Sequence, residues 1–242
     1  MHERPLFKTL FAVPLHCDGC VDSVRKALSQ VEGIQSVACH LEDQLVEVEG
    51  TAGPSAITSA LGGIGKDCIL RGSGTPNSAA VCILETHALG VENPVRGLAR
   101  LVQAGPKLMI IDLSLKGVSP GAYQASIRQN GDISRGAAST GGVWEESDSP
   151  AGLSRGRLGQ IEIDQTGSGG VLLDSPVEIW ELIGRSIVVS RRTEKFEQDD
   201  EMTLVGVIAR SAGVWENDKI VCSCSGKTVW EERTEQTSKG ML

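Results

Sequence analysis

Two pairs of closely spaced cysteines are the residues of this chain best suited to carry chemistry. Cys17 and Cys20 stand in the sequence His-Cys-Asp-Gly-Cys, and Cys222 and Cys224 stand in a polar stretch near the end. Each pair can hold one soft metal ion between two thiolates, but neither supplies the four ligands of a structural zinc site. Thiolate ligands favour Cu(I). The two pairs therefore predict a protein that binds Cu(I) and passes it on.

The first pair is expected where a strand is followed by a helix. The helix begins near Asp18, which puts Cys17 in the loop and Cys20 in the first helical turn. The partial positive charge of a helix N-terminus lowers the pKa of a thiol, so thiolates form near neutral pH. A two-coordinate ion on an exposed loop leaves room for a third thiolate from a recipient. Copper could then move by ligand exchange.

Other interpretations of these residues stay open. A Cys-x-x-Cys pair also suits redox chemistry or two ordinary thiols, although this segment is too short for a thioredoxin-like domain. His16 is expected to be exposed rather than a ligand. Lys66 either offsets the negative charge of the thiolates or is a solvated surface lysine. The remaining cysteines fall in alternating apolar stretches and are expected to pack in the core: Cys39, Cys68 and Cys82.

The second pair is expected to be reactive. Cys222 and Cys224 are too close in the chain to close a relaxed disulfide. The pair can hold Cu(I) or exchange with the thiols of a partner protein. Residues 215–242 have little apolar content, so we expect a flexible C-terminal Cys-x-Cys tail that orders only against a partner or a metal. Two idle surface thiols are the alternative.

Composition favours β structure and excludes several function classes. The 242 residues include 29 glycines and 3% aromatic residues, and the net charge of −8 argues against sequence-independent nucleic-acid binding. No apolar run approaches the roughly 20 residues of a membrane helix, and we expect no secretory signal at the N-terminus. An odd count of seven cysteines argues against a secreted disulfide framework, and closely spaced cysteine pairs without a signal point to the cytosol. Whether a fraction of the protein reaches the mitochondrial intermembrane space is left open by the sequence.

Residues 1–71 are predicted to form an α+β domain with the ferredoxin-like order β-α-β-β-α-β. Leu6 to Val13 is a strand-like stretch, and Val21, Val24 and Leu28 give the first helix an apolar face. Pro54 suits the first turn of a second helix. Residues 72–77, rich in Gly and Ser, are predicted to be the linker.

Residues 78–214 are predicted to form an all-β domain, a Greek-key sandwich or barrel, because short apolar runs alternate with turn residues. The run Ile179–Ser190 is one of these candidate strands. The stretch from Ala137 to Gly170 is rich in Gly, Ser, Thr and Asp, and is predicted to be a large surface loop.

The first segment resembles the heavy-metal-associated domain of copper chaperones and copper ATPases. The resemblance rests on the stretch from Pro14 to Cys20. That family usually has Met where this chain has Leu15. The Met packs in the core, so Leu is a volume-conserving replacement.

The second segment resembles Cu,Zn superoxide dismutase in residues 95–99, 130–132, 183–189 and 206–209. The positions where that family has copper ligands hold Ser126, Arg128 and Ser190. The dismutase site takes six histidines, whereas this chain has four, and only His87 lies in the second domain. We therefore expect a chain that is not a dismutase.

The full order resembles the family of copper chaperones for superoxide dismutase, in particular its fungal branch. This implies Cu,Zn superoxide dismutase as the partner, bound as a heterodimer through the second domain, with a homodimer as a further option. It also implies that Cys222 and Cys224 help to form the partner's disulfide. A divergent dismutase or a thiolate copper buffer are the alternatives. The candidate interface residues are Gly131, Asp132, Trp180, Ile183, Gly184, Arg210 and Trp215. For Trp180, a position in the core is the alternative.

Overall fold

The structure is a computed structural model that describes residues 4–91, 93–145, 155–192, 195–197, 200–217 and 226–238. The chain divides into two compact units. The first comprises Met1–Ala79 together with Ser211–Ser238, and the second comprises Ala80–Arg210. The segment that follows Arg210 therefore belongs with the first unit, whereas the sequence pattern placed residues up to 214 in the second domain.

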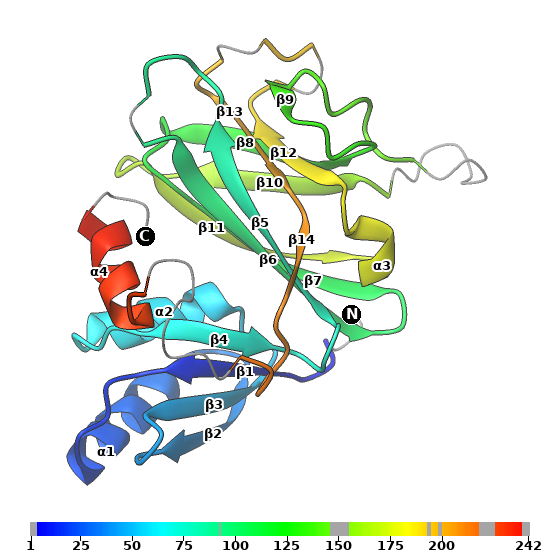
Figure 1. Cartoon of the computed structure of the whole chain (residues 1–242). Coiled ribbons are helices and arrows are strands. Elements are labelled where there is room, and N and C mark those ends of the chain that lie inside the picture. The colour runs from blue at the N-terminus through cyan, green and yellow to red at the C-terminus, as the bar shows by residue number, and fades with distance from the viewer. Residues whose placement is uncertain are drawn as a thin grey trace. The chain divides into compact units, whose positions relative to one another are not determined.

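The first unit has the predicted β-α-β-β-α-β order around one antiparallel sheet. Its strands follow the order β2-β3-β1-β4 across the sheet. Figure 1 shows this sheet with its two helices in blue and cyan. The elements are β1 (Phe7–Ala12), α1 (Asp18–Leu28), β2 (Ile34–His40), β3 (Leu45–Gly50), α2 (Pro54–Gly63) and β4 (Ile69–Ser73).

The core of this unit forms because the apolar faces of both helices pack on the same sheet. Val21, Val24 and Leu28 are the buried residues of α1, and they share a cluster with Phe11 and Val46 of the sheet. Pro54 occupies the start of α2, as the sequence predicted. The packing fixes α1 against the sheet, so the loop at its N-terminus has a rigid support.

The edge strand of this sheet also carries the segment that returns from the second unit. The Ser73 amide donates to the Ala212 carbonyl at 3.1 Å, and the Val214 amide donates to the Gly74 carbonyl at 2.9 Å. A Cβ added to Gly72 would lie 2.0 Å from the Gly213 carbonyl oxygen. The close approach of the two backbones therefore requires glycine at position 72.

The second unit is an antiparallel sheet that curves into a nearly closed barrel (Figure 1). Its strand order is β10-β8-β12-β13-β5-β6-β7-β11, with β14 paired to β5, and the end strands β10 and β11 contact each other. The elements are β5 (Ala79–Thr86), β6 (Val95–Gly105), β7 (Leu108–Lys116), β8 (Gly121–Arg128), β9 (Ser134–Ala137), β10 (Arg157–Ile163), β11 (Ser168–Ser175), α3 (Ile179–Leu182), β12 (Ser186–Ser190), β13 (Thr203–Val207) and β14 (Ala209–Ser211).

Two predictions for the second unit are wrong. The stretch from Ala137 to Gly170 is not one loop, because it contains β10 and the start of β11. Leu158, Ile161 and Ile163 alternate into the core there. The run from Ile179 to Ser190 is not a continuous strand, since it begins with the short helix α3 and turns before β12.

The predicted C-terminal tail is also more ordered than expected in its described part. Residues Val229–Ser238 form α4, although the sequence offered few apolar residues for a core. Thr228 caps this helix, because its hydroxyl accepts from the Glu231 amide at 3.2 Å. None of the described helices is long and apolar enough to cross a membrane.

Candidate functional site

The N-terminus of α1 places the sulfurs of Cys17 and Cys20 side by side. The two Sγ atoms are 3.8 Å apart. Cys17 is the N-cap residue with an extended backbone, and its carbonyl accepts from the Cys20 amide at 3.0 Å. Cys17 is exposed and Cys20 is half-buried. The arrangement suits one ion held between two thiolates at the surface.

Lys66 lies beside this pair. Its Nζ atom donates to the Pro14 carbonyl at 3.0 Å and to Cys20 Sγ at 3.2 Å. Of the two roles that the sequence left open for Lys66, the structure supports the one in which its charge offsets that of the thiolates. Lys66 comes from the loop after α2, 46 residues away from Cys20 in the chain.

The electrostatic surroundings favour a thiolate at Cys20. Hydrogen bonds from the main chain of His16, from Lys66 and from the Cys17 thiol lower the pKa of Cys20 to about 7. The thiolate form is therefore well populated at neutral pH, as a soft-metal ligand requires.

The neighbouring residues follow the sequence prediction. His16 is exposed and Leu15 is buried in the core of the first unit. The other three cysteines in the described part of the chain are core residues or pack against a core. Cys68 and Cys39 belong to the first unit, whereas Cys82 is fully buried in the second, where burial raises its pKa to about 12.

In the described part of the second unit, the residues at the expected copper-ligand positions make other interactions. Arg128 is buried, donates to the Gly141 carbonyl at 2.6 Å and packs its guanidinium over the Phe196 ring. The Ser190 and Thr203 hydroxyls are hydrogen bonded at 2.7 Å. Among the described residues, no group of three or more His, Cys, Asp and Glu side chains is placed to hold a metal ion.

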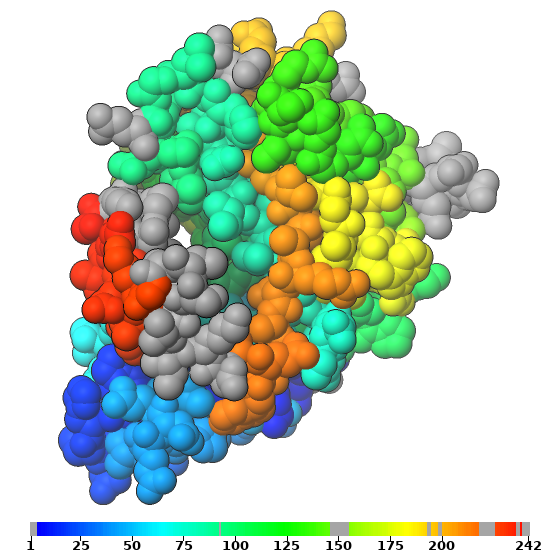
Figure 2. Space-filling view, in the orientation of Figure 1, coloured from blue at the N-terminus to red at the C-terminus, as the bar shows by residue number. Residues whose placement is uncertain are grey.

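Six of the seven candidate interface residues lie in segments that the structure brings together. A Cβ at Gly131 would lie 2.2 Å from the Gly184 carbonyl oxygen, and the Gly184 amide donates to the Ile208 carbonyl at 3.0 Å. The turn at Gly131 and Asp132, the turn at Ile183 and Gly184, and β14 with Arg210 are therefore neighbours. Figure 2 shows the α3 segment (yellow) at the surface beside the orange segment that contains β14.

Trp180 is 68% exposed on α3, so the alternative of a core position is wrong. Trp215, the seventh candidate, lies elsewhere. It belongs to the first unit, where its indole donates to Glu47 Oε2 at 2.9 Å and its ring meets His40 edge-on at 5.5 Å. Its partners in the structure are thus residues of the first sheet.

Comparison with known proteins also divides the chain into a metal-binding domain and a dismutase-like domain. Residues 9–67 match the heavy-metal-associated domain, and residues 95–213 match the copper/zinc superoxide dismutase family. The chain is 45% identical to a superoxide dismutase 1 copper chaperone of Kluyveromyces lactis, covering 95% of this chain and 94% of the relative. The chain belongs to the copper chaperones for superoxide dismutase.

Two further members of the family show that the chain is more similar to a fungal relative than to the human one. The identity is 42% with the superoxide dismutase 1 copper chaperone of Saccharomyces cerevisiae, over 97% of each chain. It is 33% with the human copper chaperone for superoxide dismutase, over 92% of this chain and 88% of that one. The sequence prediction of a fungal-type member is confirmed. These relatives are named as chaperones, and the chain is not an enzyme.

The second predicted cysteine pair, Cys222 and Cys224, lies outside the described residues. The sequence did not predict a role for Arg185, which joins α3 to the residues before the turn at Gly131. Its partner Gln129 is 56 residues away, so no short-range pattern connects the two residues.

Proposed function

We propose that this chain carries Cu(I) on Cys17 and Cys20, docks on Cu,Zn superoxide dismutase and delivers the ion to it. One observation carries the proposal. Two thiols lie 3.8 Å apart at an exposed helix N-terminus with the Lys66 ammonium 3.2 Å from one sulfur. They occur in a chain whose other unit matches the dismutase family but has Ser126, Arg128 and Ser190 where that family has copper ligands.

The chemistry of the donor set supports Cu(I) as the cargo. Two thiolates and one Cu(I) carry a net charge of −1, which the adjacent Lys66 offsets. A site with only two ligands, one of them exposed, leaves the ion open to a third thiolate. Sulfur-only coordination in X-ray absorption spectra of the copper-loaded chain, lost in a Cys17→Ser, Cys20→Ser variant, would support this assignment.

The partner is a subunit of Cu,Zn superoxide dismutase, bound as a heterodimer. The surface made by Trp180, Ile183, Gly184 and Arg210 is the docking surface in this proposal, together with the turn at Gly131 and Asp132. Exposed Trp and Arg side chains are frequent anchors of protein interfaces. A unit that retains the fold of one dismutase subunit can pair with a real subunit in an isologous manner.

The tail pair Cys222 and Cys224 has a separate role in this proposal. It exchanges thiol ligands with the partner during copper transfer and promotes the partner's intrasubunit disulfide. Forming that disulfide releases two electrons and two protons, which dioxygen takes up as the oxidant in this proposal and is thereby reduced to hydrogen peroxide. The tail then supplies chemistry, whereas the second unit supplies affinity.

A mixing experiment tests the docking step. Copper-free dismutase is mixed with the full chain, and the species are separated by sedimentation velocity. We expect a heterodimer, and we expect Trp180→Ala to weaken it. A chain that pairs only with itself would instead support a copper buffer, and would overturn the proposal.

A further inference from the structure

One arginine joins two of the segments that form the docking surface, namely α3 and the turn at Gly131 and Asp132. Arg185 Nε donates to the Glu181 carbonyl at 2.7 Å, which ties it to α3. Its Nη1 donates to the Gln129 carbonyl at 2.8 Å, directly before the turn that contains Gly131. The neighbouring Ser186 hydroxyl donates to the Asn130 carbonyl at 2.6 Å. Both hydrogen bonds join the residues directly before Gly131 to the residues directly after Gly184, beside the close approach of Gly131 to Gly184.

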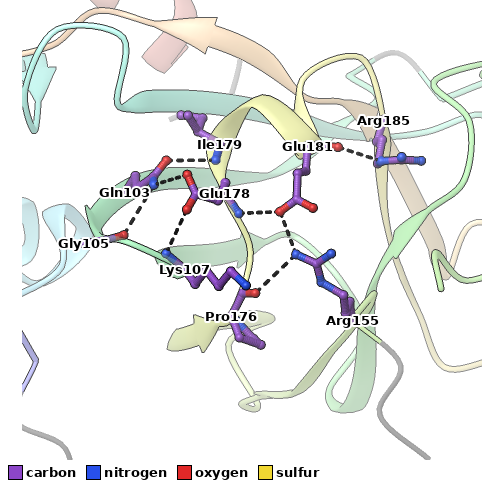
Figure 3. Close-up of polar contacts among 9 residues, drawn as sticks. All are labelled: Gln103, Gly105, Lys107, Arg155, Pro176, Glu178, Ile179, Glu181 and Arg185. Carbon is purple, nitrogen blue, oxygen red and sulfur yellow. Dashed lines mark hydrogen bonds and ion pairs between the residues drawn. The ribbon is translucent and has the colours of Figure 1, made fainter. Parts of the chain in front are cut away.

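A second arginine holds the α3 side of this arrangement. The Glu181 carboxylate binds Arg155 Nη2 at 2.6 Å and accepts from the Glu178 amide at 2.8 Å, which closes the capping box of α3. Figure 3 shows Glu181 between Arg155 and the backbone of Glu178, with Arg185 bound to the other end of the same residue.

The N-terminal end of α3, at Glu178, is also held by hydrogen bonds. The Glu178 carboxylate accepts from the Gln103 side chain at 2.9 Å and from the Lys107 amide at 3.2 Å (Figure 3). The short helix is therefore tied to the hairpin between β6 and β7 as well as to Arg155. A four-residue helix has little stability of its own, so these contacts decide its conformation.

Trp144 connects the two arginines. The guanidinium carbons of Arg185 and Arg155 lie 4.4 Å and 4.9 Å from the centroid of its buried ring. A planar guanidinium can stack on a ring and donate to two carbonyls at once, whereas a lysine ammonium cannot. Trp180 projects from α3 into solvent, while its neighbours Ile179 and Leu182 are buried. The direction of Trp180 therefore depends on how α3 is held.

We propose that Arg185 is a positioning residue for docking of the dismutase subunit. It holds α3, with Trp180, and the turn at Gly131 and Asp132 in the relative arrangement that the partner binds. This inference rests on the proposed function. It adds that the affinity for dismutase depends on a residue that need not touch the partner.

The test measures the dissociation constant of the complex between the full chain and copper-free dismutase. Arg185→Met should weaken it about tenfold or more, the size expected for loss of an interface anchor. Arg185→Lys keeps the charge and the aliphatic stem, so it folds even if the methionine variant does not, and it should weaken binding by a smaller factor. Arg192→Met, at the opposite end of β12, removes an exposed arginine and should leave binding unchanged.

A double-mutant cycle separates positioning from general destabilisation. If Arg185 acts through Trp180, the effect of Arg185→Met should be clearly smaller in a Trp180→Ala background, since coupled residues are non-additive. Fully additive effects, or no effect of either Arg185 variant while Trp180→Ala weakens binding, would overturn the inference. No effect of Trp180→Ala would instead overturn the docking surface of the proposed function.

Discussion

At the scale of single residues, the contact with Lys66 contributes to the thiolate of Cys20. Hydrogen bonds from the His16 main chain, from Lys66 and from Cys17 lower the pKa of Cys20 from 9.0 to about 7. Because the shift is downward, the thiolate is present above about pH 7 and is lost as the pH falls below it. Lys66→Met should move the midpoint of iodoacetamide labelling of Cys20 in the metal-free protein toward higher pH.

Lys26 provides the matched control for that prediction. It is an exposed lysine in the last turn of α1, away from the thiols at the first turn. Lys26→Met should leave the labelling midpoint of Cys20 where it is in the unaltered protein. If Lys66→Met had the same midpoint as Lys26→Met, Lys66 would be only a surface lysine.

Single residues also exclude dismutase chemistry in the second unit. The Arg128 guanidinium packs on Phe196 and donates to Gly141, and Ser190 is hydrogen bonded to Thr203. We therefore expect the full chain, loaded with copper and zinc and separated from unbound metal, to dismutate superoxide no faster than the metal-free chain. Substantial activity of the metal-loaded sample would contradict this assignment.

At the scale of elements, the backbone contact between β4 and the returning segment requires glycine. A Cβ at Gly72 would meet the Gly213 carbonyl oxygen at 2.0 Å, so Gly72→Ala should separate the two backbones and cost about 1–3 kcal/mol. The amides of Ser73 and Val214 should then lose protection in hydrogen exchange, because their partners are Ala212 and Gly74 across this contact.

Gly62 on α2 is the control for this substitution. A Cβ there has no neighbour within 4 Å, so Gly62→Ala should leave both amides protected and should not destabilise the helix. Retained protection of Ser73 and Val214 in Gly72→Ala would mean that the returning segment adjusts without leaving the strand.

The elements also show what the sequence could and could not predict. The βαββαβ order followed from the helical spacing of Val21, Val24 and Leu28, and from Pro54 at the start of α2. The strand β10 was missed, because Gly159 and the polar residues around it hide the alternation of its core positions. The role of Arg185 could not be predicted, since Gln129, which it joins to α3, is 56 residues away and meets it only in the folded unit.

At the scale of the whole molecule, docking and transfer should be separable. Arg210 is exposed on β14, two residues after Ile208, whose carbonyl accepts from the Gly184 amide. Arg210→Glu reverses its charge at the proposed docking surface and should weaken the complex with dismutase by about 2 kcal/mol or more. Copper binding by Cys17 and Cys20 should be unchanged, which titration with a competing Cu(I) chelator would check.

Replacing the tail pair, Cys222 and Cys224, should leave docking intact and impair activation of the partner. Cys222→Ser with Cys224→Ser removes two thiols but no residue of the docking surface, so the complex should still form. The partner should stay inactive with its disulfide unmade, which thiol trapping and gel mobility would show. Normal disulfide formation with this variant would remove the tail from the mechanism.

The most direct test of the whole account is the dismutase activity that a copper-free, disulfide-reduced dismutase regains from the copper-loaded chain. The buffer is saturated with air, so that dioxygen is present as the oxidant for the partner's disulfide. A chelator that captures free Cu(I) is present throughout, so only ligand exchange within a complex can transfer the ion. We predict full activation by the unaltered chain and none by the Cys17→Ser, Cys20→Ser variant, although that variant still binds dismutase. Equal activation by that variant would contradict copper delivery from the pair at the N-terminus of α1.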